Sequence, residues 1–144
     1  MKEVLKIVCP SCSAANRVEK ARLADRPRCG RCKQELFLSH PVDLNSANFE
    51  RTLTQNEIPV VIEFWAPWCG YCKQMSPVFQ QAAAELEPHF RLGKVNTEAE
   101  PAISGRLGVQ GIPTTIIFKN GQEVARQSGA MNLGNLLRWV RSYA

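Results

Sequence analysis

One stretch of the sequence decides how this chain folds, and it is residues 59–73, which read PVVIEFWAPWCGYCK. Its first part, Val60–Trp65, is an apolar run interrupted only by Glu63, and such a run suits a strand that is buried on both faces. Two cysteines in a Cys-x2-Cys spacing, Cys69 and Cys72, follow directly, at the point where a helical pattern begins. We therefore expect a buried strand that delivers two cysteines to the start of a helix.

The segments on both sides of this stretch alternate between helical and strand patterns. Short crossover helices between buried strands predict a parallel sheet, and Asn120-Gly121 predicts a hairpin that adds an antiparallel edge. We therefore expect an α/β domain with three layers, α/β/α, and a mixed sheet. Pro77 should kink the second helix, and Asn45 or Ser46 should cap the first. The expected strands are Pro59–Trp65, Arg91–Asn96, Thr114–Lys119 and Glu123–Gln127, and the expected helices are Ser46–Gln55, Gly70–Leu86, Pro101–Leu107 and Leu133–Tyr143.

The composition is typical of a soluble globular protein, with 44% hydrophobic and 22% charged residues in a chain of 144. This length fits a small module followed by one compact domain, and the composition changes near His40-Pro41, so we expect domains at 1–40 and 41–144. No apolar run approaches the roughly 18–20 residues of a membrane helix. The first residues also lack the apolar core of a signal peptide. We therefore expect a cytoplasmic protein without a membrane partner.

Four of the six cysteines lie near the N-terminus, in the pairs Cys9/Cys12 and Cys29/Cys32. A reducing compartment favours metal binding or redox chemistry over a disulfide framework. Two Cys-x2-Cys pairs separated by sixteen residues have the spacing of a structural zinc site, in which four thiolates surround the ion at about 2.3 Å. A module of about 40 residues can bury too little apolar surface to fold without such support. We expect one structural Zn²⁺ here and no organic cofactor, the alternative being two disulfides or free thiols.

The positive charge of the chain is confined to the same module. Residues 1–42 carry nine Lys/Arg and four Asp/Glu, a net charge of +5, whereas residues 43–144 carry nine of each. A basic module can bind nucleic acid or an acidic partner, and the chain could then be a binding module that carries the second domain. Phe37 is its lone aromatic residue, however, and stacking of bases needs several. This composition argues against a nucleic-acid partner.

The second Cys-x2-Cys pair has the chemistry of a redox site. Cys69 precedes a helix, whose free N–H groups and dipole stabilise a thiolate. Cys72 lies one turn further, where it can attack a mixed disulfide that Cys69 has formed. A metal bridged between two chains by these cysteines is the alternative, because no further pair remains in the sequence to complete a site.

At these residues the sequence resembles the thioredoxin family. Residues 64–73 resemble its active-site segment, residues 111–114 its cis-proline loop, residues 118–121 its hairpin and residues 128–130 its last substrate-facing turn. The resemblance covers about residues 41–144, and the cysteine-rich module in front is similar to that of the zinc-containing bacterial members. It implies a thioredoxin fold preceded by a zinc-ribbon-like module. The implied activity is reduction of protein disulfides, a form of electron transport, with recharging by NADPH-dependent thioredoxin reductase.

The resemblance also implies roles for individual residues. Cys69 corresponds to the attacking nucleophile and Cys72 to the resolving thiol. Glu63 stands where the family has a buried acid, usually Asp, which takes part in proton transfer with the resolving cysteine. Lys94 corresponds to the lysine near that acid, and an acid that merely pairs with Lys94 is the alternative for Glu63. Pro113 corresponds to the cis-proline.

The same resemblance predicts a substrate-docking surface around the first cysteine. Trp68, Ile112 and Gly129 should form a flat apolar face for an extended substrate chain, with Gly70 and Tyr71 beside it. Tyr71 departs from the family, which usually has Pro at this position, and Cys-Gly-Tyr-Cys is similar to the active site of periplasmic disulfide isomerases. Isomerase or oxidant activity with a raised redox potential is therefore the alternative to reduction.

Tyr71 also suggests a physical cause for a raised potential. Unlike Pro, it has a backbone N–H, which we expect to donate to the Cys69 thiolate. A stabilised thiolate makes the disulfide form more oxidising. The sequence therefore predicts a potential above the thioredoxin value of about −270 mV, near the glutaredoxin range of about −200 to −230 mV.

Overall fold

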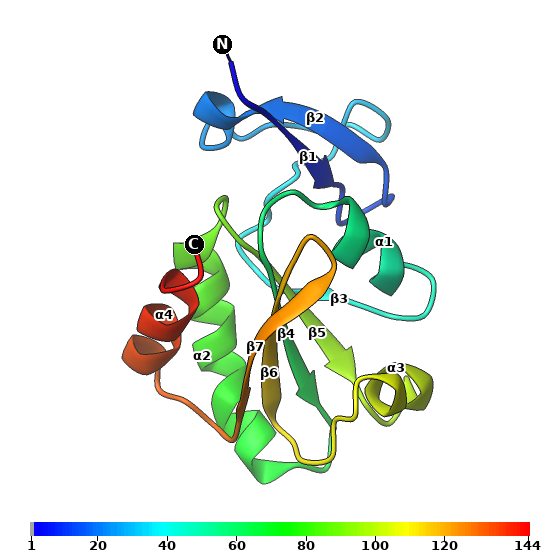
Figure 1. The fold of residues 1–144 in the computed structure, drawn as a ribbon, viewed down its shortest axis with the longest axis vertical. Coiled ribbons are helices and arrows are strands. Elements are labelled where there is room, and N and C mark those ends of the chain that lie inside the picture. Colours follow the sequence, from blue (N-terminus) through cyan, green and yellow to red (C-terminus); the bar gives the residue numbers. More distant parts are fainter. Residues whose placement is uncertain (1) are drawn as a thin grey trace.

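The computed structural model describes residues 2–144 as two bodies, a small N-terminal module and a larger α/β domain (Figure 1). The module contains an antiparallel pair of strands, β1 (Val4–Val8) and β2 (Ala15–Glu19), followed by the short 3-10 helix η1 (Lys20–Arg22). Residues 35–38 form no regular strand, and Glu35 makes an isolated β-bridge with Arg28, while the N–H of Leu36 donates to the carbonyl of Pro27. The module is therefore built mostly from loops around its four cysteines.

The main domain has a mixed sheet of five strands with the order β3-β5-β4-β6-β7. The strands β3, β5 and β4 are parallel, β6 is antiparallel to β4, and β7 forms the antiparallel edge next to β6, as the sequence predicts. Asn120 and Gly121 both have positive φ, 52° and 78°, which is the conformation of a two-residue type I′ hairpin. The strands are β3 (Val42–Asp43), β4 (Val60–Trp65), β5 (Arg91–Asn96), β6 (Thr114–Lys119) and β7 (Gln122–Ser128).

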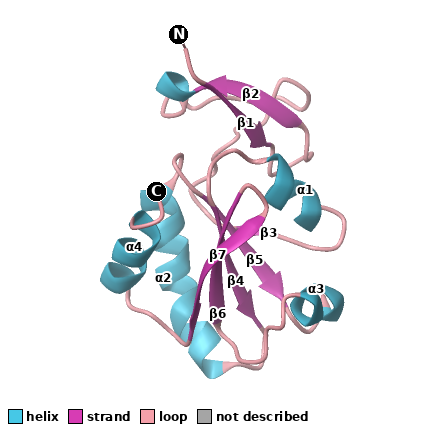
Figure 2. Cartoon of the chain, viewed as in Figure 1, coloured by secondary structure: helices cyan, strands magenta, loops and turns pink. Residues whose placement is uncertain are grey.

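Helices cover both faces of this sheet and give the expected three layers (Figure 2). The face of α2 and α4 buries Val61, Leu92 and Ile117 from the strands, and the face of α1 and α3 buries Ile62, Phe64 and Ile116. Alternate residues of β4 therefore enter two different cores, which explains its continuous apolar run. The helices are α1 (Phe49–Gln55), α2 (Gly70–Leu86), α3 (Pro101–Arg106) and α4 (Leu133–Arg141).

The structure corrects the sequence prediction at the start of the first helix. Helix α1 begins at Phe49 rather than at Ser46, because the side chain of Asn45 accepts the N–H groups of Ala47 and Asn48 in a local turn. This is the competition between short polar side chains and helical hydrogen bonds. Helix α2 continues as a helix through Pro77 to its predicted end. Among the helices of residues 2–144, none combines the length and apolar character that a membrane crossing requires.

A buried arginine joins the two bodies. The guanidinium of Arg91, at the start of β5, donates hydrogen bonds to the backbone carbonyls of Val8, at 3.2 Å, and Leu36, at 2.7 Å, both in the N-terminal module. It also forms an ion pair with Glu87 at 3.1 Å, and the two side chains are 2% and 3% exposed. The module is thereby fixed to the end of the sheet opposite to the start of α2 (Figure 1).

Candidate active site and metal centre

Cys69 and Cys72 lie where β4 passes into α2. Cys69 is the N-cap of α2, and its Sγ accepts the backbone N–H of Cys72 at 3.2 Å, so the thiol satisfies one of the free N–H groups of the first turn. On its other side the Cys69 thiol points to the carbonyl of Ile112 at 3.8 Å. Both cysteines are buried, Cys69 at 7% and Cys72 at 3% exposure. The helix start predicted from the sequence is therefore confirmed, and it aims an N–H at the first sulfur.

The donor to that sulfur is not the one that the sequence predicts. The hydrogen bond to Cys69 Sγ comes from the N–H of Cys72, and among the described residues no such bond comes from Tyr71. The side chain of Tyr71 points outward and is 67% exposed. The reason is geometric, because an N-cap side chain bends back onto the N3 residue of its helix, and Cys72 holds that position. A Pro at position 71 would leave this hydrogen bond intact.

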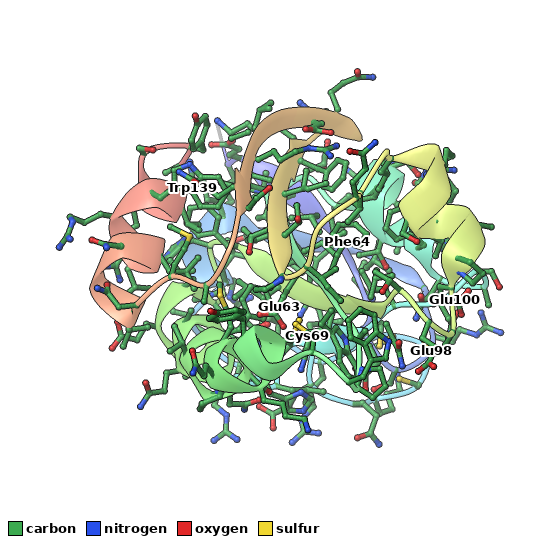
Figure 3. The ribbon with its side chains drawn as sticks, turned by 90° about the horizontal axis from the view of Figure 1, so that it is seen from below. Glu63, Phe64, Cys69, Glu98, Glu100 and Trp139 are labelled. Atoms are coloured by element: carbon green, nitrogen blue, oxygen red, sulfur yellow. The ribbon has the colours of Figure 1, made fainter. Side chains whose placement is uncertain are left out.

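Glu63 lies in β4 near Cys69, and its side chain is fully buried (Figure 3). Burial raises the pKa of its carboxyl to about 7, and the charge of Lys94 opposes that rise. The Lys94 ammonium nevertheless makes no ion pair with Glu63; it donates to Ser76 Oγ at 3.4 Å and lies 4.9 Å from the centre of the Trp65 ring. The alternative in which Glu63 only neutralises Lys94 therefore lacks the contact that it needs.

The Cys72 thiol and the Glu63 carboxyl both have raised pKa values, and the two groups line the same cavity. Burial and the hydrogen bond with Cys69 raise the pKa of the Cys72 thiol to about 12, so it is protonated at neutral pH. A cavity of about 330 Å³ lies between the two side chains. Its lining consists of Glu63, Trp65, Ala66, Pro67, Cys72, Lys73, Ser76 and Lys94. The protonated Cys72 thiol thus shares a cavity with a carboxyl that is about half ionised near pH 7.

The residues expected to dock a substrate surround Cys69. The Ile112–Pro113 peptide bond is cis, and Ile112 packs against both cysteines. The N–H of Gly129 donates to the carbonyl of Pro113 at 2.8 Å, which holds the last turn beside the proline loop. Trp68 stands out from this face with 70% of its surface exposed. Sequence positions from three separate segments thus meet at one end of the sheet, and their part in substrate binding stays a prediction.

The four remaining cysteines form one cluster in the N-terminal module. Their sulfur atoms lie within 4.8 Å of one another, with 3.6 Å between Cys9 and Cys32 and 3.6 Å between Cys12 and Cys29. Four sulfurs at about 2.3 Å from a central zinc would be about 3.8 Å apart, so the donor set fits this ion. All six cysteines of the chain are free thiols in the structure, so the alternative of two disulfides is not the state described.

Backbone N–H groups stabilise this cluster. The N–H groups of Ser11 and Arg31 donate to Cys9 and Cys29, each at 3.3 Å, in two matching turns. The positive φ angles that close these turns belong to Ser13 and Lys33, which directly follow the second cysteine of each pair. Such bonds favour the thiolate form that a metal requires.

Asn16 of β2 contacts the second cysteine turn, and sequence reasoning missed it. Its amide nitrogen donates to Cys29 Sγ at 3.5 Å, and its Oδ1 accepts the N–H of Gly30 at 2.9 Å. No apolar pattern in the sequence marks the strand that holds Asn16, because Val18 is the single buried residue of β2. It connects the first strand pair to the second cysteine pair.

Comparisons with known proteins agree with this architecture. Residues 40–142 match the family model described as thioredoxin, and residues 8–34 match the model described as the N-terminal part of thioredoxin 2. The chain is 42% identical to thioredoxin C-3 from Corynebacterium nephridii over 134 residues, which cover 93% of this chain and 92% of that protein. It is 44% identical to a putative thioredoxin 2 from Streptomyces coelicolor over 94 residues, 65% of this chain and 69% of that protein.

The fold has a counterpart among solved structures. A mutant thioredoxin from Halobacterium salinarum NRC-1 superposes with a TM-score of 0.66 and covers 73% of this chain and 91% of its own. The two sequences are 24% identical, so this likeness is one of fold. Together with the family matches and the four-cysteine cluster, it shows that the chain belongs to the thioredoxin family, with a zinc ribbon of the thioredoxin 2 type at its N-terminus.

Proposed function

We propose that this thioredoxin-family oxidoreductase reduces disulfides of protein substrates with Cys69 as nucleophile and Cys72 as resolving thiol. The observation that carries the proposal is the position of Cys69 as N-cap of α2, where the Cys72 N–H supports a thiolate. The Cys69 thiolate attacks one sulfur of a substrate disulfide, forms a mixed disulfide and expels the other substrate sulfur as a thiolate. The docking surface of Trp68, Ile112 and Gly129 holds the substrate chain during this step.

Resolution of the mixed disulfide is the task of Cys72 and Glu63. Cys72 gives its proton to the Glu63 carboxylate, and its sulfur attacks Cys69 Sγ. The bond between Cys69 and the substrate breaks, and its electron pair leaves with the substrate sulfur. The products are a reduced substrate, a Cys69–Cys72 disulfide and a protonated Glu63. Two electrons from an NADPH-dependent thioredoxin reductase then restore the dithiol, and Lys94 assists the return of the proton by its charge.

The N-terminal ribbon holds one structural Zn²⁺ through Cys9, Cys12, Cys29 and Cys32 in this proposal. The ion would fix the loops of the module and supply no redox chemistry, because Zn²⁺ has a single stable oxidation state. A nucleic-acid role for the ribbon is less well supported. Its lone aromatic residue, Phe37, is covered by the Arg91 guanidinium at 4.7 Å and is therefore occupied within the protein. We place the protein in the cytoplasm, since both cysteine sites need reducing conditions.

The order of attack is tested with single substitutions at the two cysteines. Cys69→Ser should abolish reduction of insulin disulfides, measured as turbidity. Cys72→Ser should form a mixed disulfide with a substrate through Cys69 and hold it, because the resolving thiol is gone, and mass spectrometry of the trapped complex identifies the linked cysteine. Normal turnover by the Cys72→Ser variant would contradict the assigned order.

A further inference from the structure

Thr115 is a buried polar residue beside the active site. It lies in β6 directly opposite Glu63 in the antiparallel pairing of β4 and β6, and both residues have zero exposure. Directly paired residues of antiparallel strands place their side chains on the same face of the sheet, with Cβ atoms about 4.5–5.5 Å apart. Thr115 therefore faces the same layer between sheet and α2 that contains Glu63 and Cys72.

Both side chains carry buried polar atoms without a hydrogen-bond partner. In the described residues the buried side-chain atoms that lack a partner are the two carboxyl oxygens of Glu63, the hydroxyl of Thr115 and Nε1 of Trp65. Buried polar groups are nearly always paired in native proteins, so two unpaired groups on directly opposed residues are natural partners for each other. The spacing of their Cβ atoms lets a hydroxyl reach a carboxylate through one side-chain rotation or through one water.

The other strand neighbour of Glu63 does not fill this role. Lys94 is paired with Glu63 in β5, but its ammonium donates to Ser76 and lies over the Trp65 ring. Lys94 therefore acts on Glu63 through its charge and leaves the oxygens of Glu63 without a hydrogen bond. Within the described chain, two buried neutral donors without a partner are left on the sheet, Trp65 Nε1 and the Thr115 hydroxyl, and Thr115 is the one directly paired with Glu63.

We propose that Thr115 is a positioning residue for disulfide exchange, whose hydroxyl donates a hydrogen bond to the Glu63 carboxylate and holds it in place for the Cys72 proton. The proposal rests on the proposed function of Glu63. It gives a reason for a glutamate in β4, because the longer side chain brings the carboxylate within reach both of a donor across the strands and of α2. The proton, sulfur and electron-pair transfers of resolution stay as described above.

Removal of the hydroxyl tests this role. Thr115→Val keeps the branched shape and removes the donor, and Thr115→Ser keeps the donor. A hydrogen bond to the charged form lowers a carboxyl pKa, so Thr115→Val should raise the pKa of Glu63 by about one unit or more, and Thr115→Ser should leave it near the parental value. The readout is the infrared band of the protonated carboxyl in the reduced protein, followed against pH and assigned with Glu63→Gln.

The pH dependence of the resolution rate provides a second readout, which a mere packing defect at position 115 would not reproduce. If the pKa rises from about 7 to about 8, the ionised fraction at pH 7 falls about fivefold, and the resolution rate should fall with it. The rates of parent and Thr115→Val should converge near pH 9, where both carboxyls are ionised. The other titratable groups that face Glu63 are Lys94 from β5 and Cys72 and Lys73 from α2, and all are unchanged in the variant.

The outcomes separate the two claims. Thr52→Val serves as the control, because Thr52 is a buried threonine of α1 on the opposite face of the sheet, and it should change neither the pKa nor the pH profile. A parental Glu63 pKa in Thr115→Val would overturn the role of Thr115. A parental resolution rate in Glu63→Gln would instead overturn the proton transfer of the proposed function, whatever the infrared band of Thr115→Val shows.

Discussion

Glu63 carries a charge that folding disfavours, and this has a consequence for stability. Its carboxyl has a pKa of about 7 in the folded protein, raised by burial, against about 4.5 when exposed. The folded state therefore binds more protons than the unfolded state between these values, so the free energy of unfolding falls as the pH rises from about 4.5 to about 7 and stays low above.

This dependence can be measured with one substitution. Glu63→Gln removes the titration, so the fall in unfolding free energy between pH 5 and pH 8 should shrink by up to about 3 kcal/mol, at about 1.4 kcal/mol per pKa unit. Urea titrations of both proteins at the two pH values provide the measurement. The Cys72 thiol titrates above this window and does not contribute. Equal pH dependence in parent and variant would show that Glu63 is solvated.

Tyr71 shows how a correct motif can suggest an incorrect contact. Its N–H lies in the first turn of α2 without a bond to Cys69, so its influence is limited to that of one more free N–H at a helix start. Such an effect of about 0.3–1 kcal/mol corresponds to a change of about 6–20 mV in the reduction potential of the Cys69–Cys72 disulfide. Tyr71→Pro should therefore make the protein more reducing by this small amount in a glutathione titration. A shift of 40 mV or more would restore the direct hydrogen bond that the sequence suggested.

At the scale of elements, the sequence predicted the main domain correctly where a local pattern has a direct physical cause, such as burial, a positive φ or a helix start. The buried run of β4, the Asn120-Gly121 turn and the start of α2 at Cys69 are all confirmed. The errors fall on short elements. β3 has two residues and β2 a single buried side chain, so neither has an apolar pattern to find. β2 owes its place to pairing with the neighbouring β1, and β3 to pairing with the distant β5.

The helix ends offer a test at this scale. Asn132 is the N-cap of α4, where its Oδ1 accepts the N–H of Asn135 at 2.8 Å. Asn132→Ala should lower the free energy of unfolding by about 0.5–2 kcal/mol because it leaves that N–H without a partner, and Asn132→Ser should restore most of the loss. Urea denaturation measures both. If alanine and serine destabilise equally, the cap contributes little and α4 is held by its packing on α2.

At the scale of the whole molecule, the sequence predicts a cysteine-rich module and an α/β domain but cannot reveal how they join. Arg91 looks like an ordinary charged residue at the start of a strand. In the structure it is buried and donates to two carbonyls of the ribbon, and Ile58 of the main domain lies in the ribbon's core. Such contacts depend on residues that are distant in sequence, and no periodicity encodes them.

Metal removal tests both the zinc site and this junction. Purified protein should contain about one zinc per chain. A chelator should unfold residues 1–40 and leave residues 41–144 folded but less stable by about 1–3 kcal/mol, because Arg91 loses two hydrogen-bond acceptors. Near-UV circular dichroism and the melting temperature report the change, and added Zn²⁺ should reverse it. Protein without zinc whose four ribbon thiols are freely alkylated would contradict the metal assignment.

The placement of the ribbon also has a consequence for simultaneous binding. The ribbon occupies the end of the sheet opposite to the start of α2, where Cys69 lies (Figure 1). A partner bound at the ribbon therefore leaves the surface around Cys69 accessible. The hydrogen bonds of Arg91 tie the ribbon to the α/β domain, so the ribbon and the cysteines lie at opposite ends of one molecule. A substrate bound at the ribbon could reach Cys69 only if its own disulfide extended around the whole domain. A scaffold protein bound at the ribbon would instead leave the cysteines exposed to neighbouring substrates, at a high effective concentration.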